Sequence, residues 1–507
     1  MFARVNSYVL NGIGCDEVEI ESDQSGGLHN FILVGLPDVS VREAKERVGA
    51  AIKNSGLKPP HHFGRITVCL APSDLRKTGS GLDLPIAISI LEATGQIPTK
   101  VNDAVYIGAL SLDGKLRKTS GILPMVIAAK EKGYKHIFIP RDNLYEARLV
   151  QGIRIIPLIS ISDYARRVKG GGFTPVRGRG NQKGVPDEIC YDVDISDIKG
   201  QEKAKRALLI IAAGAHNMLM YGPPGSGKTM LARSLPSILP RLSPEEALEV
   251  TKIYSVAGLL PDDVRLMRVR PFRSPHHTAS GIALIGGGTK IHPGEITLAH
   301  RGVLFLDELL EHSRRTLDNL RQPVEEGFVT ISRSSGTVTY PSRFIFIGAT
   351  NPCPCGYAHD PEKECRCTQA ALMQYRQKLS GPIIDRIDVF VEVQRIKYEK
   401  LCSLGKKGDS HKLREQVQNA RNMQIDRFSG SPLLTNADMR LTDIQKFCQL
   451  KEKENSFLKK AVKLYHLSVR AYCRILKIAR TIADLEGEKQ ISQTHIAEAI
   501  QYRITDM

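Results

Sequence analysis

Several features that define other classes of protein are missing from this chain of 507 residues. It has no tryptophan, and aromatic residues make up only 6% of it. No stretch approaches the ~20 continuous apolar residues that a membrane-spanning helix needs. The stretch from Met1 to Glu17 has no long apolar core of the kind found in signal peptides. We therefore expect a cytoplasmic protein that does not enter a membrane.

Cysteine is too scarce for a secreted scaffold held together by disulfides. The chain has ten cysteines in all, whereas such scaffolds are short and dense in cysteine. A hydrophobic content of 42% is enough for ordinary globular cores. The length predicts two to four domains.

Acidic residues are outnumbered by basic ones. Lys and Arg total 71 against 54 for Asp and Glu, which gives a net charge of +17. This excess favours a polyanionic partner, and nucleic acid is the commonest one. Charge alone also fits a soluble basic protein without such a partner, so the motifs must decide.

The most informative stretch runs from Met218 to Leu231 and contains the pattern G-x-x-x-x-G-K-T. Apolar residues precede it, as a buried strand requires, and a helix-compatible run follows it. In this context glycines turn backbone N–H groups toward phosphate oxygens, and the helix N-terminus adds a favourable dipole. The alternative is a Gly/Pro turn with a chance Lys-Thr. The expected nucleotide-binding residues are Gly222, Pro223, Pro224, Gly225, Ser226, Gly227, Lys228 and Thr229.

Each polar residue of this loop has an expected task. Lys228 would reach the β- and γ-phosphates of ATP, and Thr229 would offer its hydroxyl to Mg²⁺.

Further along, the stretch from Arg301 to Leu309 predicts a buried strand that ends in Asp307 and Glu308. Asp307 would hold Mg²⁺ together with Thr229, and Glu308 would polarise the attacking water as general base. Two acids that merely cap the next helix are the alternative, which the preceding phosphate loop disfavours.

The surroundings of the phosphate loop resemble AAA+ ATPases. The resemblance lies in the segment from Asp194 to Gly214, just before the loop. It implies that Asn351, at the end of an apolar strand from Arg343 to Pro352, is the sensor 1 residue that orients the water. An Asn that starts a turn is the alternative.

The same resemblance implies two functional arginines. Arg386 matches the arginine finger, which enters the γ-phosphate site of the neighbouring subunit and stabilises transition-state charge. An ion pair with Asp385 or Asp388 is the alternative. Arg470 matches the sensor 2 arginine, which reaches the γ-phosphate in the same chain, with an ordinary surface arginine as the alternative.

Residues 396–507 are expected to form the small helical lid of an AAA+ module, after a core at residues 191–395. Helical patterns occupy residues 433–507. Ser468 or Thr494 fits a helix N-cap, and Gly487 fits a helix C-cap.

Residues 1–168 predict a separate mixed α/β domain. Strand-like and helix-like runs alternate, and Ser40 with Glu43 fits a capping box at the start of a helix. The stretches Lys77 to Leu91 and Ser111 to Pro140 resemble the Lon-protease-like fold, a ribosomal S5-type α/β fold.

The resemblance to Lon proteases does not extend to their Ser–Lys dyad. Gly81, or Ser80 one position away, stands where the serine is expected, and Leu123 stands where the lysine is expected. Without a nearby base, Ser80 is not an activated nucleophile. We expect a non-proteolytic domain that serves assembly or partner contact.

Residues 169–190 predict a basic, glycine-rich linker. The run from Arg166 to Lys183 carries six basic residues and no acidic ones. Such a segment could touch nucleic-acid phosphates or could be a solvated tether. The sequence favours neither.

Two inserts narrow the family further. The stretch from Arg270 to Leu309, broken by glycines, resembles the magnesium-chelatase-like AAA+ family of the ComM/YifB type, which also carries a Lon-like N-terminal domain. The stretch from Gly327 to Phe344 predicts a β-hairpin before the sensor strand. In that branch the hairpin points into the pore of a ring. Arg333 near its tip and Lys290 in the other insert are candidate contacts to nucleic-acid phosphates.

Six further side chains suggest metal chemistry. His276 and His277 could be metal ligands, although packing or subunit contact is the favoured interpretation. Four thiols follow the sensor strand in the pattern C-x-C-x₉-C-x-C, and they could form a structural, tetrahedral Zn²⁺ site or remain reduced thiols in a loop. These are Cys353, Cys355, Cys365 and Cys367.

Together these features predict an α/β fold class: a Lon-like N-terminal domain, a P-loop AAA+ core and a helical lid. The resemblance implies a homo-hexameric ATPase that uses ATP and Mg²⁺ and acts on single-stranded or branched DNA during recombination or natural transformation. One rival is a chelatase subunit that drives metal insertion through a partner. The Lon-like domain, the basic charge and the lack of an integrin-type domain after the lid disfavour it. The other rival is a nucleotide-switched scaffold, which Glu308 disfavours.

Overall fold

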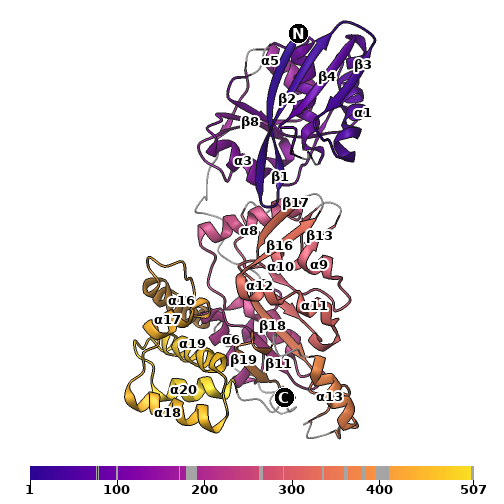
Figure 1. Cartoon of the computed structure of the whole chain (residues 1–507). Coiled ribbons are helices and arrows are strands. Elements are labelled where there is room, and N and C mark those ends of the chain that lie inside the picture. Colours follow the sequence, from indigo (N-terminus) through magenta and orange to yellow (C-terminus); the bar gives the residue numbers. More distant parts are fainter. Residues whose placement is uncertain are drawn as a thin grey trace.

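The computed structural model describes residues 1–75, 77, 79–98, 101–170, 172–177, 191–261, 266–288, 291–333, 336–358, 363–378, 384–395 and 410–503. An α/β domain comes first in the chain, a second α/β unit follows it, and a group of helices lies beside the second unit (Figure 1). The fold class predicted from the sequence, mixed α/β with a helical C-terminal region, is confirmed. Among the described residues no helix is long and apolar enough to cross a membrane.

The first domain is built on an eight-stranded sheet with the order β10-β9-β8-β5-β1-β2-β4-β3. Its strands are β1 (Phe2–Asn11), β2 (Gly14–Ser25), β3 (Asn30–Val34), β4 (Arg65–Ala71), β5 (Ala104–Tyr106), β8 (His136–Pro140), β9 (Arg154–Leu158) and β10 (Val176–Arg177). A small separate ladder joins β6 (Ala109–Leu110) to β7 (Leu116–Arg117). The edge strand β10 lies within the stretch predicted as a linker, whose residues 178–190 fall outside the described residues.

Helices cover both faces of this sheet. They are α1 (Val39–Asn54), α2 (Asp83–Ala93), α3 (Ile122–Glu131), α4 (Leu144–Ala147) and α5 (Ile161–Lys169). Neighbouring residues of one strand enter different cores, because successive side chains of a strand point to opposite faces. Tyr106 packs in the core that contains α1 and α2, and Val105 packs in the core that contains α3.

The start of α1 differs from the prediction. Its N-cap is Asp38, whose side chain accepts a hydrogen bond of 2.7 Å from Val41 N. Ser40 therefore lies inside the helix. Asp38 has extended backbone, which leaves its carboxylate free to cap, and Pro37 precedes it.

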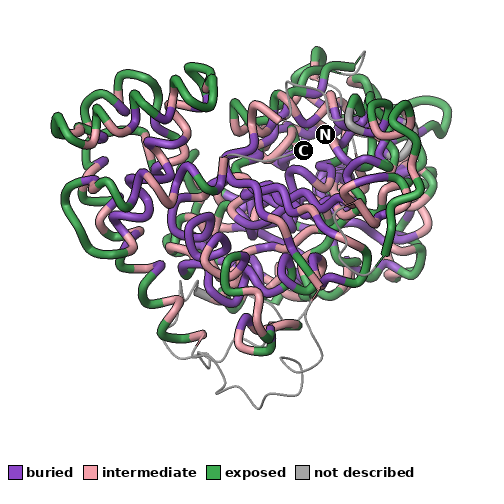
Figure 2. Tube along the Cα trace, turned by 90° about the horizontal axis from the view of Figure 1, so that it is seen from below, coloured by how far each residue is buried: buried purple, intermediate pink, exposed green. Residues whose placement is uncertain are grey.

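The second unit contains a five-stranded sheet with the order β12-β15-β18-β11-β19, in which all neighbours are parallel. Its strands are β11 (Met218–Tyr221), β12 (Phe272–Arg273), β15 (Val303–Leu306), β18 (Ile345–Thr350) and β19 (Val389–Glu392). The helices of this unit are α6 (Glu202–Gly214), α7 (Lys228–Ser234), α8 (Pro244–Ala257), α9 (Gly281–Ile285), α10 (Glu295–Leu298), α11 (Arg314–Asp318), α12 (Arg321–Glu326) and α13 (Gln369–Lys378). The central strands are buried on both faces (Figure 2), which explains their continuous apolar runs.

Two β-hairpins project from this sheet. One pairs β13 (Gly286–Gly287) with β14 (His292–Pro293), and the other pairs β16 (Phe328–Arg333) with β17 (Gly336–Pro341). The second hairpin is the one predicted from the sequence, and its tip residues Ser334 and Ser335 lie outside the described residues.

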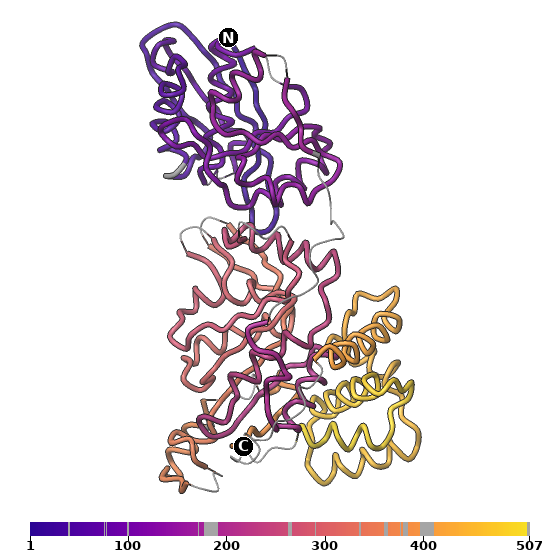
Figure 3. Tube along the Cα trace, turned by 180° about the vertical axis from the view of Figure 1, so that it is seen from behind, coloured from indigo at the N-terminus to yellow at the C-terminus, as the bar shows by residue number. Residues whose placement is uncertain are grey.

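In its described residues, 410–503, the C-terminal region has five helices and lies against the side of the second unit (Figures 1 and 3). They are α16 (Ser410–Arg427), α17 (Leu441–Phe447), α18 (Glu452–Leu464), α19 (Val469–Leu485) and α20 (Gln493–Gln501). Helices α16 and α19 pack on α6, so this region shares a hydrophobic core with the sheet. Ser468 caps α19 as predicted, and Gly487 has positive φ after it. Ser492 rather than Thr494 caps α20.

Among the described residues, the contacts between the two α/β units lie at two places. Ser255 at the end of α8 accepts a hydrogen bond of 2.8 Å from Gly121 N and donates one of 2.7 Å to the buried carboxylate of Glu146. At the other place the turn between β1 and β2 meets β17: a Cβ atom added to Gly12 would lie 2.5 Å from Val338 Cγ1. Figure 1 shows this turn directly above the β16–β17 hairpin.

Candidate nucleotide-binding site

Three neighbouring strands end at the same edge of the central sheet, and each end carries a polar motif. The loop from Gly222 to Thr229 follows β11, Asp307 follows β15, and Asn351 follows β18. Strand β18 lies between the other two and is parallel to both. The carboxyl edge of a parallel sheet is where such folds bind ligands. The structure therefore brings together the residues that the sequence assigned to ATP.

Lys228 is the central cation of this edge. It is 8% exposed. Its Nζ donates to the carbonyl oxygens of Gly222 at 2.7 Å and Pro223 at 3.0 Å, and to Asn351 Oδ1 at 3.3 Å. Burial lowers the pKa of Lys228, while Asp307 and Glu308 act in the opposite direction. The ammonium is buried, its hydrogen bonds named above go to neutral oxygens, and two acids lie nearby. A cation in such surroundings is well matched to a phosphate group.

The carboxylate of Asp307 joins the end of β15 to the start of α7. Thr229 Oγ1 donates to Asp307 Oδ2 at 2.7 Å, and Glu308 N donates to Asp307 Oδ1 at 2.9 Å. A hydroxyl and a carboxylate in contact are the oxygen donors that Mg²⁺ prefers beside phosphates. These two side chains therefore fit the role of magnesium ligands.

The glycines and Ser226 of the loop also fit a phosphate cradle. A Cβ atom at Gly222 would lie 2.1 Å from the carbonyl oxygen of Val393, so only glycine fits where the loop passes the end of β19. Gly225 and Gly227 have φ of +76° and +91°, and a side chain there would meet open space rather than protein. The buried hydroxyl of Ser226 has no partner among the described residues. An unsatisfied buried donor beside an open loop is consistent with a bound phosphate.

Glu308 stands at the mouth of this site in a strained conformation. Its φ is +49°, in the left-handed region that non-glycine residues rarely adopt. Its side chain is 54% exposed, and His277 Nδ1 lies 3.4 Å from its Oε2. His277 follows β12, the strand beside β15, and its ring lies against that of His276.

The histidine pair thus has a place that the sequence analysis did not give it. Neither His276 nor His277 belongs to a group of three or more metal-ligating side chains in the described part of the chain. His277 instead contacts the expected general base. Sequence reasoning missed this contact because β12 has only two residues, too short to be recognised from periodicity.

Arg386 lies at the opposite edge of the sheet from the phosphate loop. It precedes β19, which is parallel to β11 with Met218 opposite Val389. The phosphate loop follows the other end of β11. Arg386 forms an ion pair with Glu325 rather than with Asp385 or Asp388. It cannot reach the phosphate loop of its own chain in this arrangement.

The position of Arg470 differs from the prediction of a same-chain contact with phosphate. Its guanidinium donates to Asp385 at 2.9 Å, next to Arg386. One cavity is lined by Glu325, Asp385, Arg386, Arg470 and Arg474. The physical reason is the packing of α19 on α6 and α17, which holds the start of α19 at the amino edge of the sheet. Both arginines therefore share the edge that faces away from the phosphate loop.

The two inserts pack against each other. A Cβ atom at Gly287 of β13 would lie 3.6 Å from a guanidinium nitrogen of Arg333, and Ile331 joins the core beneath β13. Arg333 is exposed at the end of β16. Lys290, the other predicted phosphate contact, lies outside the described residues.

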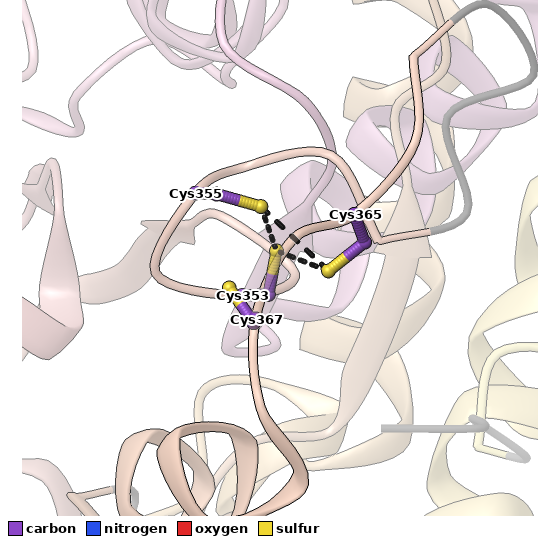
Figure 4. A group of neighbouring side chains, drawn as sticks. All are labelled: Cys353, Cys355, Cys365 and Cys367. Carbon is purple, nitrogen blue, oxygen red and sulfur yellow. Dashed lines mark hydrogen bonds between the residues drawn. The ribbon is translucent and has the colours of Figure 1, made fainter.

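The four clustered cysteines converge on one point (Figure 4). Their Sγ atoms all lie within 4.8 Å of one another, with Cys353 3.2 Å from Cys355 and 3.7 Å from Cys365. The pKa of Cys355 falls to about 6, first because Tyr357 N–H donates to it. Cys367 completes the group. Four sulfurs at these separations can surround a single metal ion.

Comparisons with known proteins agree with this geometry. Residues 194–401 match the magnesium chelatase subunit ChlI family, residues 20–143 match subunit ChlI of Mg-chelatase, and residues 407–503 match the ChlI C-terminal family. Competence protein ComM of Haemophilus influenzae is 42% identical over 506 residues, covering 99% of this chain and 97% of that protein. Protein YifB of Escherichia coli is 40% identical over 506 residues, again covering 99% and 97%.

A more distant relative is a subunit of a magnesium chelatase. The magnesium-chelatase 38 kDa subunit of Rhodobacter capsulatus is 24% identical over 320 residues, covering 59% of this chain and 83% of that protein. The fold and the site together define a P-loop ATPase of the AAA+ type. The chain belongs to the magnesium-chelatase-like family, in the group that contains ComM and YifB.

Proposed function

We propose that this protein is an ATP-driven motor that acts on DNA as a ring of six identical chains. The observation that carries the proposal is the separation of two parts of one catalytic site. Lys228, Thr229, Asp307 and Asn351 lie at one edge of the sheet, and Arg386 lies at the other. A site that uses all of these residues needs two chains. In a closed ring, every pair of neighbouring chains forms one such site.

Each residue has a defined task in this proposal. The loop from Gly222 to Thr229 binds the triphosphate, and Thr229 and Asp307 hold Mg²⁺, which neutralises charge on the phosphate oxygens. Glu308 accepts a proton from the attacking water, and Asn351 orients that water. Arg386 of the neighbouring chain, with Arg470 beside it, stabilises negative charge in the transition state.

Three observations support DNA as the substrate. The chain carries a net charge of +17, which favours a polyanion. It is 42% identical to a protein named for competence. Arg333 stands exposed on a hairpin beside the glycine-rich strand β13. In the ring these hairpins line the pore and contact phosphates, and the N-terminal domain braces the hairpin from outside. Zn²⁺ at the four cysteines is a structural cofactor of this assembly.

The rate of ATP hydrolysis with and without DNA tests the proposal. Purified protein is assayed alone, with single-stranded DNA and with a forked duplex, at low and at moderate salt. We expect stimulation by DNA that weakens as salt rises, because phosphate contacts release counterions. An Arg333→Ala variant should keep the unstimulated rate and lose most of the stimulation. Absence of stimulation by either DNA would contradict the motor hypothesis.

A second candidate function rests on the distant relative. The match to the magnesium-chelatase 38 kDa subunit is consistent with an ATPase that drives metal insertion through a partner. The same assay separates the two functions. ATP hydrolysis indifferent to DNA, together with binding of a tetrapyrrole-carrying partner subunit, would favour the chelatase function.

A further inference from the structure

The cysteine loop lies directly against the phosphate loop. Cys353 follows the sensor residue Asn351 by two positions. The turn closes when Gly356 N donates to the carbonyl oxygen of Cys353 at 2.9 Å. A Cβ atom at Gly356, whose φ is +84°, would lie 2.8 Å from Pro224 Cδ. One short turn therefore touches Pro224 of the phosphate loop and continues from Asn351.

No regular element holds the described part of this loop in place. Its described residues contain no helix or strand between Thr350, the end of β18, and Gln369, the start of α13. The four sulfurs supply the missing constraint. The Sγ–Sγ distances are 3.2 Å between Cys353 and Cys355, 3.6 Å between Cys355 and Cys365, and 3.7 Å between Cys365 and Cys353. Zn–S bonds of about 2.3 Å in a tetrahedron place sulfurs roughly 3.8 Å apart.

A metal ion at this point would tie three parts of the site together. Cys353 and Cys355 belong to the turn against Pro224, and Cys365 and Cys367 belong to the return that leads into α13. Helix α13 is itself anchored to the sensor strand, since Tyr375 Oη lies 3.5 Å from Thr350 Oγ1. Four thiolates fill every position around a tetrahedral zinc ion, so the ion would act as a cross-link and not as a catalyst.

We propose that a Zn²⁺ ion held by these four cysteines fixes one wall of the nucleotide pocket, so that loss of zinc weakens nucleotide binding. This inference rests on the proposed ATP-binding function. For a segment without regular structure, the free energy of metal binding becomes free energy of folding. Without the ion, the turn loses its fixed position against Pro224, and Asn351 loses its anchored neighbour.

Metal content and nucleotide affinity, measured on the full chain, test the proposal. Protein purified without added metal is analysed by inductively coupled plasma mass spectrometry and titrated with a fluorescent ADP analogue. We expect about one zinc per chain and saturable binding. A Cys365→Ser/Cys367→Ser double variant should contain no zinc and bind the analogue about tenfold more weakly. A Cys69→Ser variant, altered on β4 of the first domain, should match the wild type in both measurements.

A second variant separates the contact from the metal. Gly356→Ala leaves all four cysteines in place but pushes a methyl group into Pro224. It should retain its zinc and still bind the analogue more weakly. Circular dichroism and melting curves establish that both variants are folded.

Three outcomes would overturn the inference. Wild-type protein without zinc would remove the metal, and zinc-free protein with unchanged nucleotide affinity would remove the coupling while leaving the ATPase proposal intact. If the wild type bound no nucleotide although it contained zinc, the proposed function itself would fail, and this inference with it.

Discussion

At the scale of single residues, Glu308 and His277 lie together at the mouth of the proposed nucleotide site. Glu308 is held in a left-handed backbone conformation, and its side chain is exposed beside His277. Such strain persists only where the surrounding structure fixes it, and it is common at active sites. A carboxylate in that position can accept the proton of an attacking water.

Replacing Glu308 by Gln should separate binding from hydrolysis. The amide keeps the shape of the side chain but cannot accept a proton, so the rate of ATP hydrolysis should fall by about 10²–10⁴-fold while nucleotide affinity changes little. Steady-state phosphate release and analogue titration measure the two quantities. Glu311→Gln is the matched control, because Glu311 is an exposed acid three residues on. Full turnover by the Glu308 variant would remove this residue from its assigned role.

His277 is expected to position Glu308 rather than to react. His277 follows β12, and its Nδ1 lies 3.4 Å from Glu308 Oε2. His277→Ala should free the carboxylate of Glu308 to adopt other rotamers. We therefore expect kcat to fall about tenfold, with KM changed less than about twofold. His277→Asn can still offer an N–H to Glu308 and should recover part of the rate.

A different outcome would assign His277 another task. If His277→Ala and His277→Asn lowered kcat equally, the contact would not depend on a hydrogen-bond donor. If both raised KM and left kcat unchanged, His277 would serve nucleotide binding. Parallel measurement on His276→Ala, whose ring touches His277 but not Glu308, controls for packing.

At the scale of elements, the positions of motifs that follow buried apolar strands could be predicted from the sequence. The positions of residues that depend on how helices pack could not. Strands β11, β15 and β18 are mostly apolar, and Gly222, Asp307 and Asn351 follow them directly. Sequence alone was enough to assemble that site, because carboxyl ends of parallel strands meet. The nucleotide loop and the acidic pair were predicted for this reason, whereas the hairpin β16–β17 was predicted from two strand-like runs joined by a turn.

Arg470 shows where prediction from sequence stops. The helix that carries it was predicted, and its N-cap Ser468 was correct. Which edge of the sheet the helix faces depends on how α19 packs against α6 and α17, and no local pattern encodes that choice. The prediction of the N-cap of α1 was wrong for a local reason. Asp38 and Ser40 are both residue types that cap helices well, and the backbone geometry selected Asp38.

The contact between the two α/β units should depend on pH. Glu146 is buried at this junction, where Ser255 and Asn143 donate to it, and burial raises its pKa above the ordinary value of 4.5. A carboxyl whose pKa is raised on folding stabilises the fold below its unfolded pKa. That contribution is lost as pH rises through the folded pKa, because the folded state then holds a proton that the unfolded state has released.

Glu146→Gln should remove this dependence. Glutamine keeps an oxygen that can accept from Asn143 and has no charge to bury. Between pH 4.5 and neutral pH, the melting temperature of the wild type should fall relative to that of the variant. Differential scanning calorimetry across this window measures the difference. A constant difference at every pH would show that Glu146 does not titrate in the window.

At the scale of the whole molecule, the two edges of the central sheet carry different parts of the proposed catalytic site. The carboxyl edge holds the residues that we propose bind and activate nucleotide, and the amino edge holds Arg386 with Arg470 beside it. Four residues of β11 and β19 separate these edges, about 13 Å at the usual rise of a strand. A single chain would therefore be a poor ATPase, and turnover should rise with protein concentration as rings form.

Mixing two inactive variants tests whether the site is shared between chains. Arg386→Ala should inactivate the arginine edge and Glu308→Gln the nucleotide edge, so each protein alone should hydrolyse little ATP. Co-assembly in equal amounts should complete about a quarter of the sites, because half of the chains supply Glu308 and half of their neighbours supply Arg386. A mixture of Glu308→Gln with Lys228→Ala should recover nothing, since both residues act from the same chain and no chain carries both. Equal recovery in the two mixtures, or none in either, would show that Arg386 does not complete the site of a neighbour.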